Sequence, residues 1–187
     1  MADPDPVRIR AFVFDVDGVL TDGSVYIGES GEEMKRFSVL DGPAFHWCRL
    51  MGYEVALLSG RSSRATARRA EELGIESVYQ GVRDKACQVA AWAAEKGLRP
   101  DEILYMGDDQ IDLPVFEVAG IAVAPANAAQ EVRERATHVT RRRGGEGAAR
   151  EAVEWLLFRA GRLDEARRRY RRGLTGEGDG GDDSAEG

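Results

Sequence analysis

Cysteine and histidine are scarce in this chain, which has two of each among its 187 residues. Cys48 and Cys87 are too few and too far apart in sequence to form a disulfide framework or a zinc cluster. We therefore expect them to be reduced thiols of a cytoplasmic protein. His46 and His138 stand in no motif typical of a metal site or a catalytic dyad, so packing is their expected role.

Long apolar runs are also missing. No stretch reaches the ~18 uninterrupted apolar residues that a membrane-spanning helix needs. The first ten residues, MADPDPVRIR, lack the basic and then apolar layout of a signal peptide. We therefore expect neither membrane insertion nor export. The length and the hydrophobic content of 43% are typical of one soluble domain with a sizeable core.

Basic residues are fewer than acidic ones, and the formal net charge is −7. Five of the acids lie in TGEGDGGDDSAEG, residues 175–187, which has no basic residue and no apolar face. We expect disorder over residues 173–187. Without these acids the chain carries about −2, which favours neither nucleic-acid nor membrane binding. The Arg-rich stretch 159–172 is most simply a solvated helix of alternating charge.

Short apolar runs alternate with amphipathic stretches along most of the chain. The pattern predicts strands at 10–14, 54–58, 77–79, 102–106 and 120–124. It predicts helices at 43–52, 62–73, 83–96, 110–118, 128–135 and 147–160. This alternation indicates a three-layer, Rossmann-like α/β fold, with a parallel sheet between helices on both faces. Residues 23–40 interrupt the alternation, because two β-rich runs around a Gly-containing turn predict a β-hairpin.

Acidic residues follow two of the expected strands, at the sheet edge where ligands bind in open parallel sheets. The run AFVFDVDG has Asp15 and Asp17 near its end, and the run YMGDDQID holds Asp108, Asp109 and Asp112. Carboxylates this close repel one another unless a cation or a shared proton joins them. Two acidic strand ends that converge on one place suit a hard cation such as Mg²⁺.

Two further strand ends carry groups that can bind phosphate. Ser59, Gly60 and Arg61 offer a hydroxyl and backbone N–H groups at the start of a helix, although a serine there is also an ordinary cap. Lys85 follows the third strand. Together the four clusters support phosphoryl transfer to an aspartate, with a second carboxylic acid to protonate the leaving alcohol and then activate water.

Four segments resemble, in order, the motifs of the haloacid dehalogenase superfamily of phosphatases: DVDGVLTDG, LLSGR, the Lys of VRDK, and GDDQIDLP. Over residues 10 to about 165 the chain is similar, more narrowly, to the phosphatases of 3-deoxy-D-manno-octulosonate 8-phosphate, which implies one domain over residues 8–165. These phosphatases have no cap domain, and the resemblance implies a homotetramer in which neighbouring subunits cover each other's sites. The 23–40 hairpin suits that arrangement, and a flap over its own site is the alternative.

The resemblance also implies roles for the residues at the strand ends. Asp15 would be the nucleophile and Asp17 the general acid/base, with Mg²⁺ held by the Asp15 carboxylate, the Asp17 carbonyl and Asp108. The other implied site residues are the phosphate- or substrate-binding Ser59, Gly60, Arg61, Lys85 and Arg141, and the supporting Asp109 and Asp112. For the segment around Arg141, a helix-leading loop is an equally good interpretation.

The expected partner is a small sugar phosphate, and neither a nucleic acid nor a membrane. The resemblance favours the octulosonate ester, because the related phosphatases of nonulosonate 9-phosphates look like they carry an acid at the position of Arg61. An arginine can pair bidentately with the carboxylate of a sugar acid. Leu40 and the run Pro43-Ala44-Phe45 depart from the family pattern and leave specificity open. A nonulosonate 9-phosphate phosphatase is one alternative. The other is a non-catalytic oligomerisation module related to the C-terminal domains of sugar nucleotidyltransferases.

Overall fold

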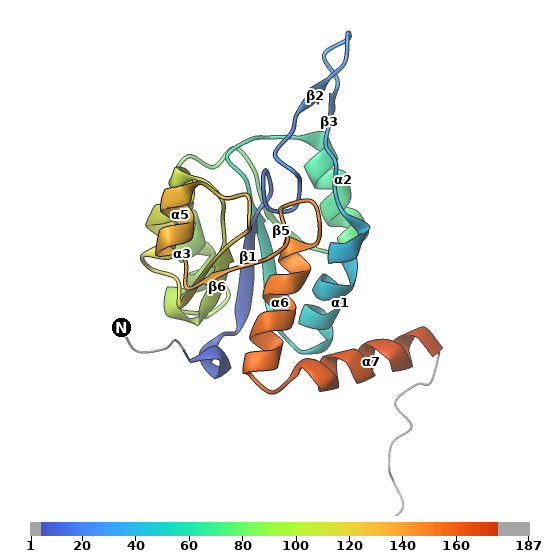
Figure 1. Cartoon of the computed structure of the whole chain (residues 1–187), viewed down its shortest axis with the longest axis vertical. Coiled ribbons are helices and arrows are strands. Elements are labelled where there is room, and N and C mark those ends of the chain that lie inside the picture. Colours follow the sequence, from blue (N-terminus) through green and yellow to red (C-terminus); the bar gives the residue numbers. More distant parts are fainter. Residues whose placement is uncertain (1–4, 176–187) are drawn as a thin grey trace, which may run out of the picture.

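A single parallel sheet organises the protein, whose computed structural model describes residues 5–175. Its six strands lie in the order β5-β4-β1-β6-β7-β8, so that β1 is central (Figure 1). They are β1 (Ala11–Asp15), β4 (Glu54–Leu58), β5 (Ser77–Tyr79), β6 (Ile103–Met106), β7 (Ile121–Ala124) and β8 (His138–Val139). The five predicted strands are confirmed, and β8 adds a sixth at the edge beside β7.

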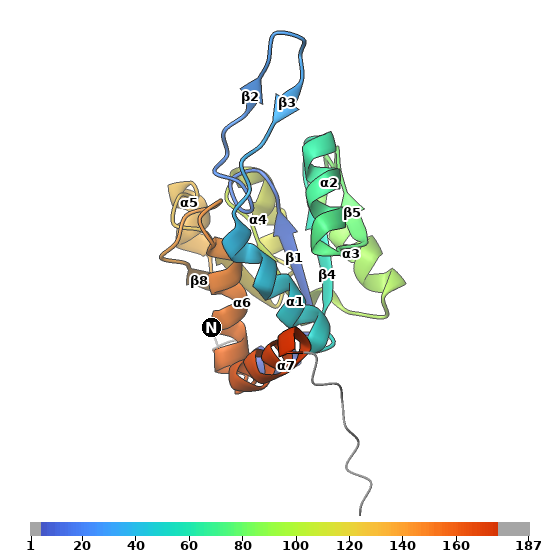
Figure 2. The same cartoon turned by 90° about the vertical axis from the view of Figure 1, so that its right-hand side faces the viewer.

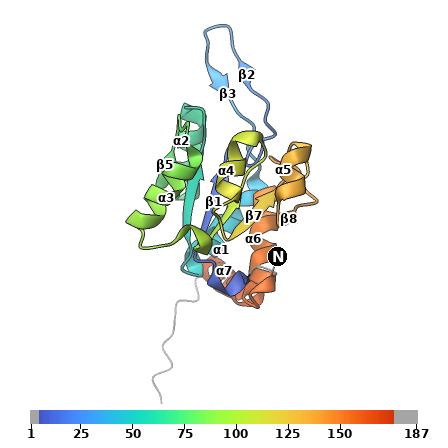
Figure 3. The ribbon, with the colours of Figure 1, turned by 90° about the vertical axis from the view of Figure 1, so that its left-hand side faces the viewer.

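Helices cover both faces of the sheet, because the strands are apolar on both sides. In β1, Phe12 and Phe14 pack into one core and Ala11 and Val13 into the other. The first core also holds residues of α1 (Gly42–Leu50), α2 (Arg64–Leu73), α6 (Ala148–Arg159) and α7 (Leu163–Thr175), and the second holds residues of α3 (Lys85–Glu95), α4 (Leu113–Phe116) and α5 (Gln130–Arg135). Figures 2 and 3 show the two faces, and the predicted three-layer fold is confirmed.

The helix predicted over 110–118 is divided. Gln110–Asp112 forms a 3₁₀ turn, and α4 starts after it with Pro114 in its first turn, where a missing N–H costs little. Three more 3₁₀ turns, at Pro6–Arg8, Val39–Asp41 and Pro100–Glu102, lead into β1, α1 and β6. The other helices lie where the periodicity predicts them, within about two residues.

The Arg-rich C-terminal helix is less solvated than its sequence suggests. Ala166 of α7 is fully buried in the core against α1. Arg162 and Arg169 donate hydrogen bonds to the Met51 and Leu50 carbonyls at the end of α1 (3.1 and 2.9 Å). Cations here satisfy the carbonyls that the helix leaves free. The packed body therefore continues past residue 165, and α7 includes 173–175; residues 176–187 of the expected tail lie outside the described residues.

A hairpin projects from the body just after β1 (Figures 1 and 2). Its strands, β2 (Tyr26–Ile27) and β3 (Glu33–Met34), pair antiparallel, and a bridge joins Thr21 to Phe37 at its base. Between residues 5 and 175 it is the largest excursion from the sheet and helices, and no cap domain is present. None of the described helices is both long and apolar enough to cross a membrane.

Asp41 is a buried acid where the chain returns from the hairpin to α1. Its Oδ1 accepts a hydrogen bond from the Arg150 N–H of α6 (3.0 Å), and its buried Oδ2 has no hydrogen-bond partner. Burial raises the pKa of Asp41 from 3.8 to about 6, and the Arg150 N–H and the nearby arginines Arg69 and Arg142 only partly oppose this. At neutral pH the fold therefore keeps a costly ionised carboxylate inside.

We expect Asp41→Asn to stabilise the protein relative to wild type as the pH rises. A raised native pKa means that the wild type loses stability between about pH 4 and pH 6, where the buried carboxyl ionises, whereas the amide keeps the same acceptor at every pH. The relative gain should be on the order of 2 kcal/mol by pH 7.5. Urea unfolding at pH 4.5, 5.5 and 7.5 measures it. A difference that stays constant with pH would contradict this account of Asp41.

Candidate active site

The carboxyl end of β1 buries an acid against a lysine. Asp15 is 4% exposed, and its Oδ1 lies 3.0 Å from Nζ of Lys85 at the start of α3. The same ammonium lies 2.6 Å from Oδ1 of Asp112, which is also buried. Burial alone would lower the pKa of Lys85, but the charges of Asp15 and Asp112 dominate and raise it. The lysine therefore stays charged between two carboxylates.

Asp112 makes several hydrogen bonds within the protein. Its Oδ1 also accepts from the Tyr105 hydroxyl (2.6 Å), and its Oδ2 accepts from the backbone N–H groups of Asp108 and Asp109 (2.9 and 3.1 Å). A side chain on Gly107 would clash with the Asp112 carboxylate. With both oxygens engaged, Asp112 can hold Lys85 and the β6 loop in place, but it has little capacity left to bind a ligand.

The acid cluster at this edge suits a hard cation. Oxygens of Asp15, Asp108 and Asp112 lie within 4.8 Å of one another. Burial, aided by the charge of Asp112 and opposed by Lys85, raises the pKa of Asp15 to about 7. Burial and the charge of Asp15 raise the pKa of Asp108 to about 8, and the buried Asp108 Oδ1 has no hydrogen-bond partner. Three carboxylates with only the Lys85 ammonium to balance their charge form an all-oxygen set that fits Mg²⁺, which would keep these acids ionised.

The loop after β1 is held against Asp108. Gly18 has a φ of +90°, and a side chain on it would clash with the Asp108 carboxylate. Thr21 Oγ1 accepts from the N–H of Gly18 (3.2 Å), and Asn127 Nδ2 donates to the Gly18 carbonyl (2.9 Å). Asn127 Oδ1 in turn accepts from the Gly144 N–H (2.6 Å). The loop after β1 is therefore joined to the loops after β7 and β8.

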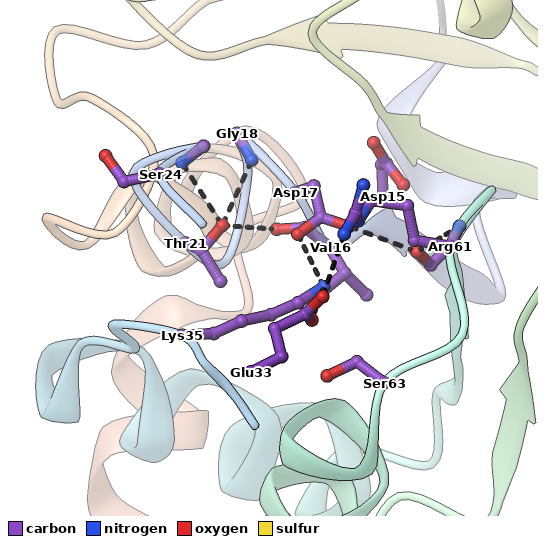
Figure 4. A network of polar contacts seen from close by, with 12 residues as sticks. Asp15, Val16, Asp17, Gly18, Thr21, Ser24, Glu33, Lys35, Arg61 and Ser63 are labelled. Carbon is purple, nitrogen blue, oxygen red and sulfur yellow. Dashed lines mark hydrogen bonds and ion pairs between the residues drawn. The ribbon is translucent and has the colours of Figure 1, made fainter. Parts of the chain in front are cut away.

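Asp17 lies beside the base of the hairpin (Figure 4). Its Oδ1 is 2.6 Å from Lys35 Nζ, and its Oδ2 accepts from the Ser59 hydroxyl (3.3 Å). Ser59 Oγ also accepts from the backbone N–H of Arg61 (3.1 Å). The Arg61 guanidinium donates to Glu33 of β3 (2.8 Å). Groups from β1, the hairpin and the loop after β4 thus meet at one place.

Most of the residues predicted for the site lie together, but the side chains of Asp109 and Arg141 do not join them. Gly60 lies in the exposed loop beside Ser59, where phosphate N–H donors were expected. The Asp109 carboxylate is exposed and accepts from the Gln110 N–H (2.7 Å), which makes it a cap of the 3₁₀ turn. Arg141 is exposed, and its backbone N–H donates to Glu151 (2.9 Å). Among residues 5–175 no contact joins the Arg141 side chain to the acid cluster.

The sequence reasoning missed Lys35, Glu33, Asn127 and Tyr105. Glu33 and Lys35 are two positions apart on an extended segment, so both side chains point to one side, and this spacing was the available signal. Tyr105 is the penultimate residue of β6, shortly before the acidic run, and this position was the available signal. For Asn127 the sequence offers no signal, because its role depends on loops that are far apart in the chain.

Residues 77–151 match the family of haloacid dehalogenase-like hydrolases. The chain is 42% identical over 160 residues to "3-deoxy-D-manno-octulosonate 8-phosphate phosphatase KdsC" of Escherichia coli K12, which covers 86% of this chain and 85% of that protein. This match is longer than the family segment and extends over most of the chain.

Solved structures agree with this likeness. The fold superposes with a TM-score of 0.85 on a probable YrbI family phosphatase from Pseudomonas syringae, at 44% identity over 89% of this chain and 94% of that one. It superposes with a TM-score of 0.83 on the Moraxella catarrhalis octulosonate 8-phosphate phosphatase, solved with magnesium, phosphate and KDO, at 34% identity over 86% and 92% of the two chains. The chain belongs to the family of 3-deoxy-D-manno-octulosonate 8-phosphate phosphatases, within the haloacid dehalogenase-like hydrolases.

Proposed function

We propose that the protein is a Mg²⁺-dependent phosphatase that hydrolyses 3-deoxy-D-manno-octulosonate 8-phosphate to the free sugar acid and phosphate. The observation that carries the proposal is the group formed by the buried Asp15 and Lys85 and the half-buried Asp108 at the end of the central strand. Membership of the family supports the assignment of the octulosonate ester as the substrate. The related M. catarrhalis enzyme was solved with magnesium, phosphate and KDO, which are the proposed metal ion and the two products of this reaction.

In the proposed reaction an Asp15 oxygen attacks phosphorus, and the P–O bond to the sugar breaks. Asp17 donates its proton to the departing sugar oxygen, and the ionised Asp17 then takes a proton from the water that attacks the aspartyl-phosphate. The second step releases phosphate and restores Asp15. A magnesium ion held by the Asp15 carboxylate, the Asp17 carbonyl and Asp108 would stabilise charge on the phosphoryl oxygens.

The remaining residues of the site are assigned by their positions. Lys85, the Ser59 hydroxyl and the backbone at Gly60 would bind the phosphoryl oxygens. Asp112 would hold Lys85 in place. The Arg61 guanidinium would bind the sugar-acid carboxylate, for which a planar fork of N–H donors is suited. Asp109 would support the waters of the metal ion, and Arg141 would approach the substrate from the loop after β8.

The departures from the family pattern after the hairpin do not argue against the octulosonate ester. Ala44 and Phe45 face the core, where the Phe45 ring packs edge-on against Phe14 with centroids 5.4 Å apart. Leu40 is partly exposed and lies close to the backbone of Gly147. Side chains that pack into the core present no group to a substrate. Arg61, rather than these residues, carries the preference.

We also propose that the protein is a homotetramer of the cytoplasm. The hairpin exposes apolar side chains, with Tyr26, Ile27 and Met34 at 49%, 74% and 58% exposure. A two-stranded hairpin is only marginally stable by itself, and contiguous exposed apolar residues mark interaction sites. A neighbouring subunit that covers them would place the hairpin at a shared active site. The free thiols of Cys48 and Cys87 suit a reducing compartment.

Phosphate release from a panel of esters tests the function. The panel contains the octulosonate 8-phosphate, a nonulosonate 9-phosphate, hexose phosphates and p-nitrophenyl phosphate, each with Mg²⁺ and with EDTA. We expect a strong preference for the octulosonate ester and no release with EDTA. Preference for the nonulosonate ester would make that ester the substrate in place of the octulosonate ester. No release from any ester would favour the non-catalytic module.

We expect Gly18→Ala to lower Mg²⁺-dependent kcat/KM at least about 100-fold, because the new methyl group would displace the Asp108 carboxylate. Gly31→Ala is the matched control. Gly31 has a similar φ of +83° but no atom within 4 Å of the added carbon, so it bears the backbone strain without the clash. Equal losses in both variants would mean that strain, and not the contact with Asp108, is responsible.

Ile27→Asp should break the proposed tetramer, because it places a charge in the apolar surface of the hairpin. Light scattering after size exclusion gives the mass of wild type and variant. Phe158→Asp serves as the control, since Phe158 is exposed on α6 away from the hairpin. A monomeric wild type would contradict the tetramer, and a variant of unchanged mass would exclude the hairpin as its interface.

A further inference from the structure

The base of the hairpin reaches the proposed catalytic residues, and from this geometry we infer that Glu33 and Lys35 are positioning residues of the reaction. Lys35 holds the Asp17 carboxylate in the place where it acts as acid and base. Glu33 holds the Arg61 guanidinium in the place where it meets the carboxylate of the substrate. The inference rests on the proposed function, because it assumes those roles of Asp17 and Arg61.

Lys35 is unusual for a lysine of a projecting hairpin. Its side chain is 0% exposed, although the chain around it lies at the surface. Its Nζ lies 2.6 Å from Asp17 Oδ1, a distance typical of a strong charge-assisted hydrogen bond. Burying an ammonium costs free energy that only a close, lasting partner offsets. The side chain is therefore fixed on Asp17 and is not a solvated surface charge.

Asp17 is held on both of its oxygens by groups from different elements. Lys35 binds Oδ1 from the hairpin, and the Ser59 hydroxyl donates to Oδ2 from the loop after β4. An acid/base must be aligned with the proton it transfers, and a small displacement of such a group slows the chemical step strongly. If phosphate displaces the Ser59 hydroxyl, Lys35 becomes the partner that keeps Asp17 in position.

Glu33 connects the same hairpin to Arg61. Its Oε2 accepts from Arg61 Nη2 (2.8 Å), and its Oε1 lies 3.7 Å from Lys35 Nζ. The Glu33 carboxylate uses only part of the five-donor fork of Arg61, so the remaining N–H groups are free to bind a carboxylate of the substrate. An arginine that is already oriented loses less conformational entropy when the substrate binds. Glu33 should therefore affect KM more than kcat.

Steady-state kinetics of Lys35→Met and Lys35→Arg test the role of Lys35. We expect Lys35→Met to lower kcat about 10- to 100-fold with KM within about twofold, as for residues that orient a reacting group. Lys35→Arg keeps the charge and should restore most of the rate, and it remains informative if Lys35→Met unfolds. An unchanged kcat in Lys35→Met, or a loss confined to KM, would overturn the role of Lys35.

Kinetics of Glu33→Gln with two substrates test the role of Glu33. We expect KM for the octulosonate ester to rise about tenfold, and KM for p-nitrophenyl phosphate, which lacks a carboxylate, to change much less. Glu32→Gln is the matched control, because Glu32 is exposed near the tip of the hairpin and accepts a hydrogen bond from the Ser30 hydroxyl. Its kcat and KM should equal those of wild type. An equal rise for both substrates would overturn the role of Glu33.

These outcomes separate the inference from the function on which it rests. A wild-type protein that hydrolyses no ester overturns the proposed function and the inference together. An active wild type whose Lys35 and Glu33 variants match the Glu32 control overturns only the inference.

Discussion

One buried ammonium holds the site together. Lys85 lies between Asp15 and Asp112, and its charge offsets the cost of burying two carboxylates at the end of the central strand. Without it, Asp15 and Asp112 would repel each other and Asp108 in a region with little water. The position of β1 between β4 and β6 then brings the loops of Ser59 and Asp108 to the same edge of the sheet.

The loop after β1 is fixed from two opposite directions. On one side Asn127 joins Gly18 to Gly144, so that the last loops of the sheet hold the first. On the other side Lys35 joins the hairpin to Asp17. Pre-organisation of this kind is what electrostatic catalysis requires, because the groups do not need to move as charge develops. The fold supplies it with ordinary loops and no cap domain among the residues described.

Much of the fold and part of the site could be predicted because they follow from local patterns. The strands are short apolar runs. Asp15 ends one of them, Asp17 and Asp108 come within two residues of a strand end, and Lys85 starts the helix that follows β5. Contacts across the fold could not be read in this way. Lys35 looks like a solvated charge in the sequence, and only the folded hairpin places it on Asp17. The hydrogen bonds from Arg162 and Arg169 to the end of α1 could not be predicted for the same reason, because these residues stand among many other arginines.

The order of the residues along the chain also matters while the protein is being made. The apolar strand β1 is synthesised before β4 and β6, which pair with its two edges. An unpaired apolar strand is the kind of segment that associates with other chains, and flanking charges oppose this. Until Lys85 and the later loops are made, the side chains of Asp15 and Asp17 lie in water. The carboxylates of the candidate site therefore also place charge at the end of the nascent strand, where charge opposes association with other chains.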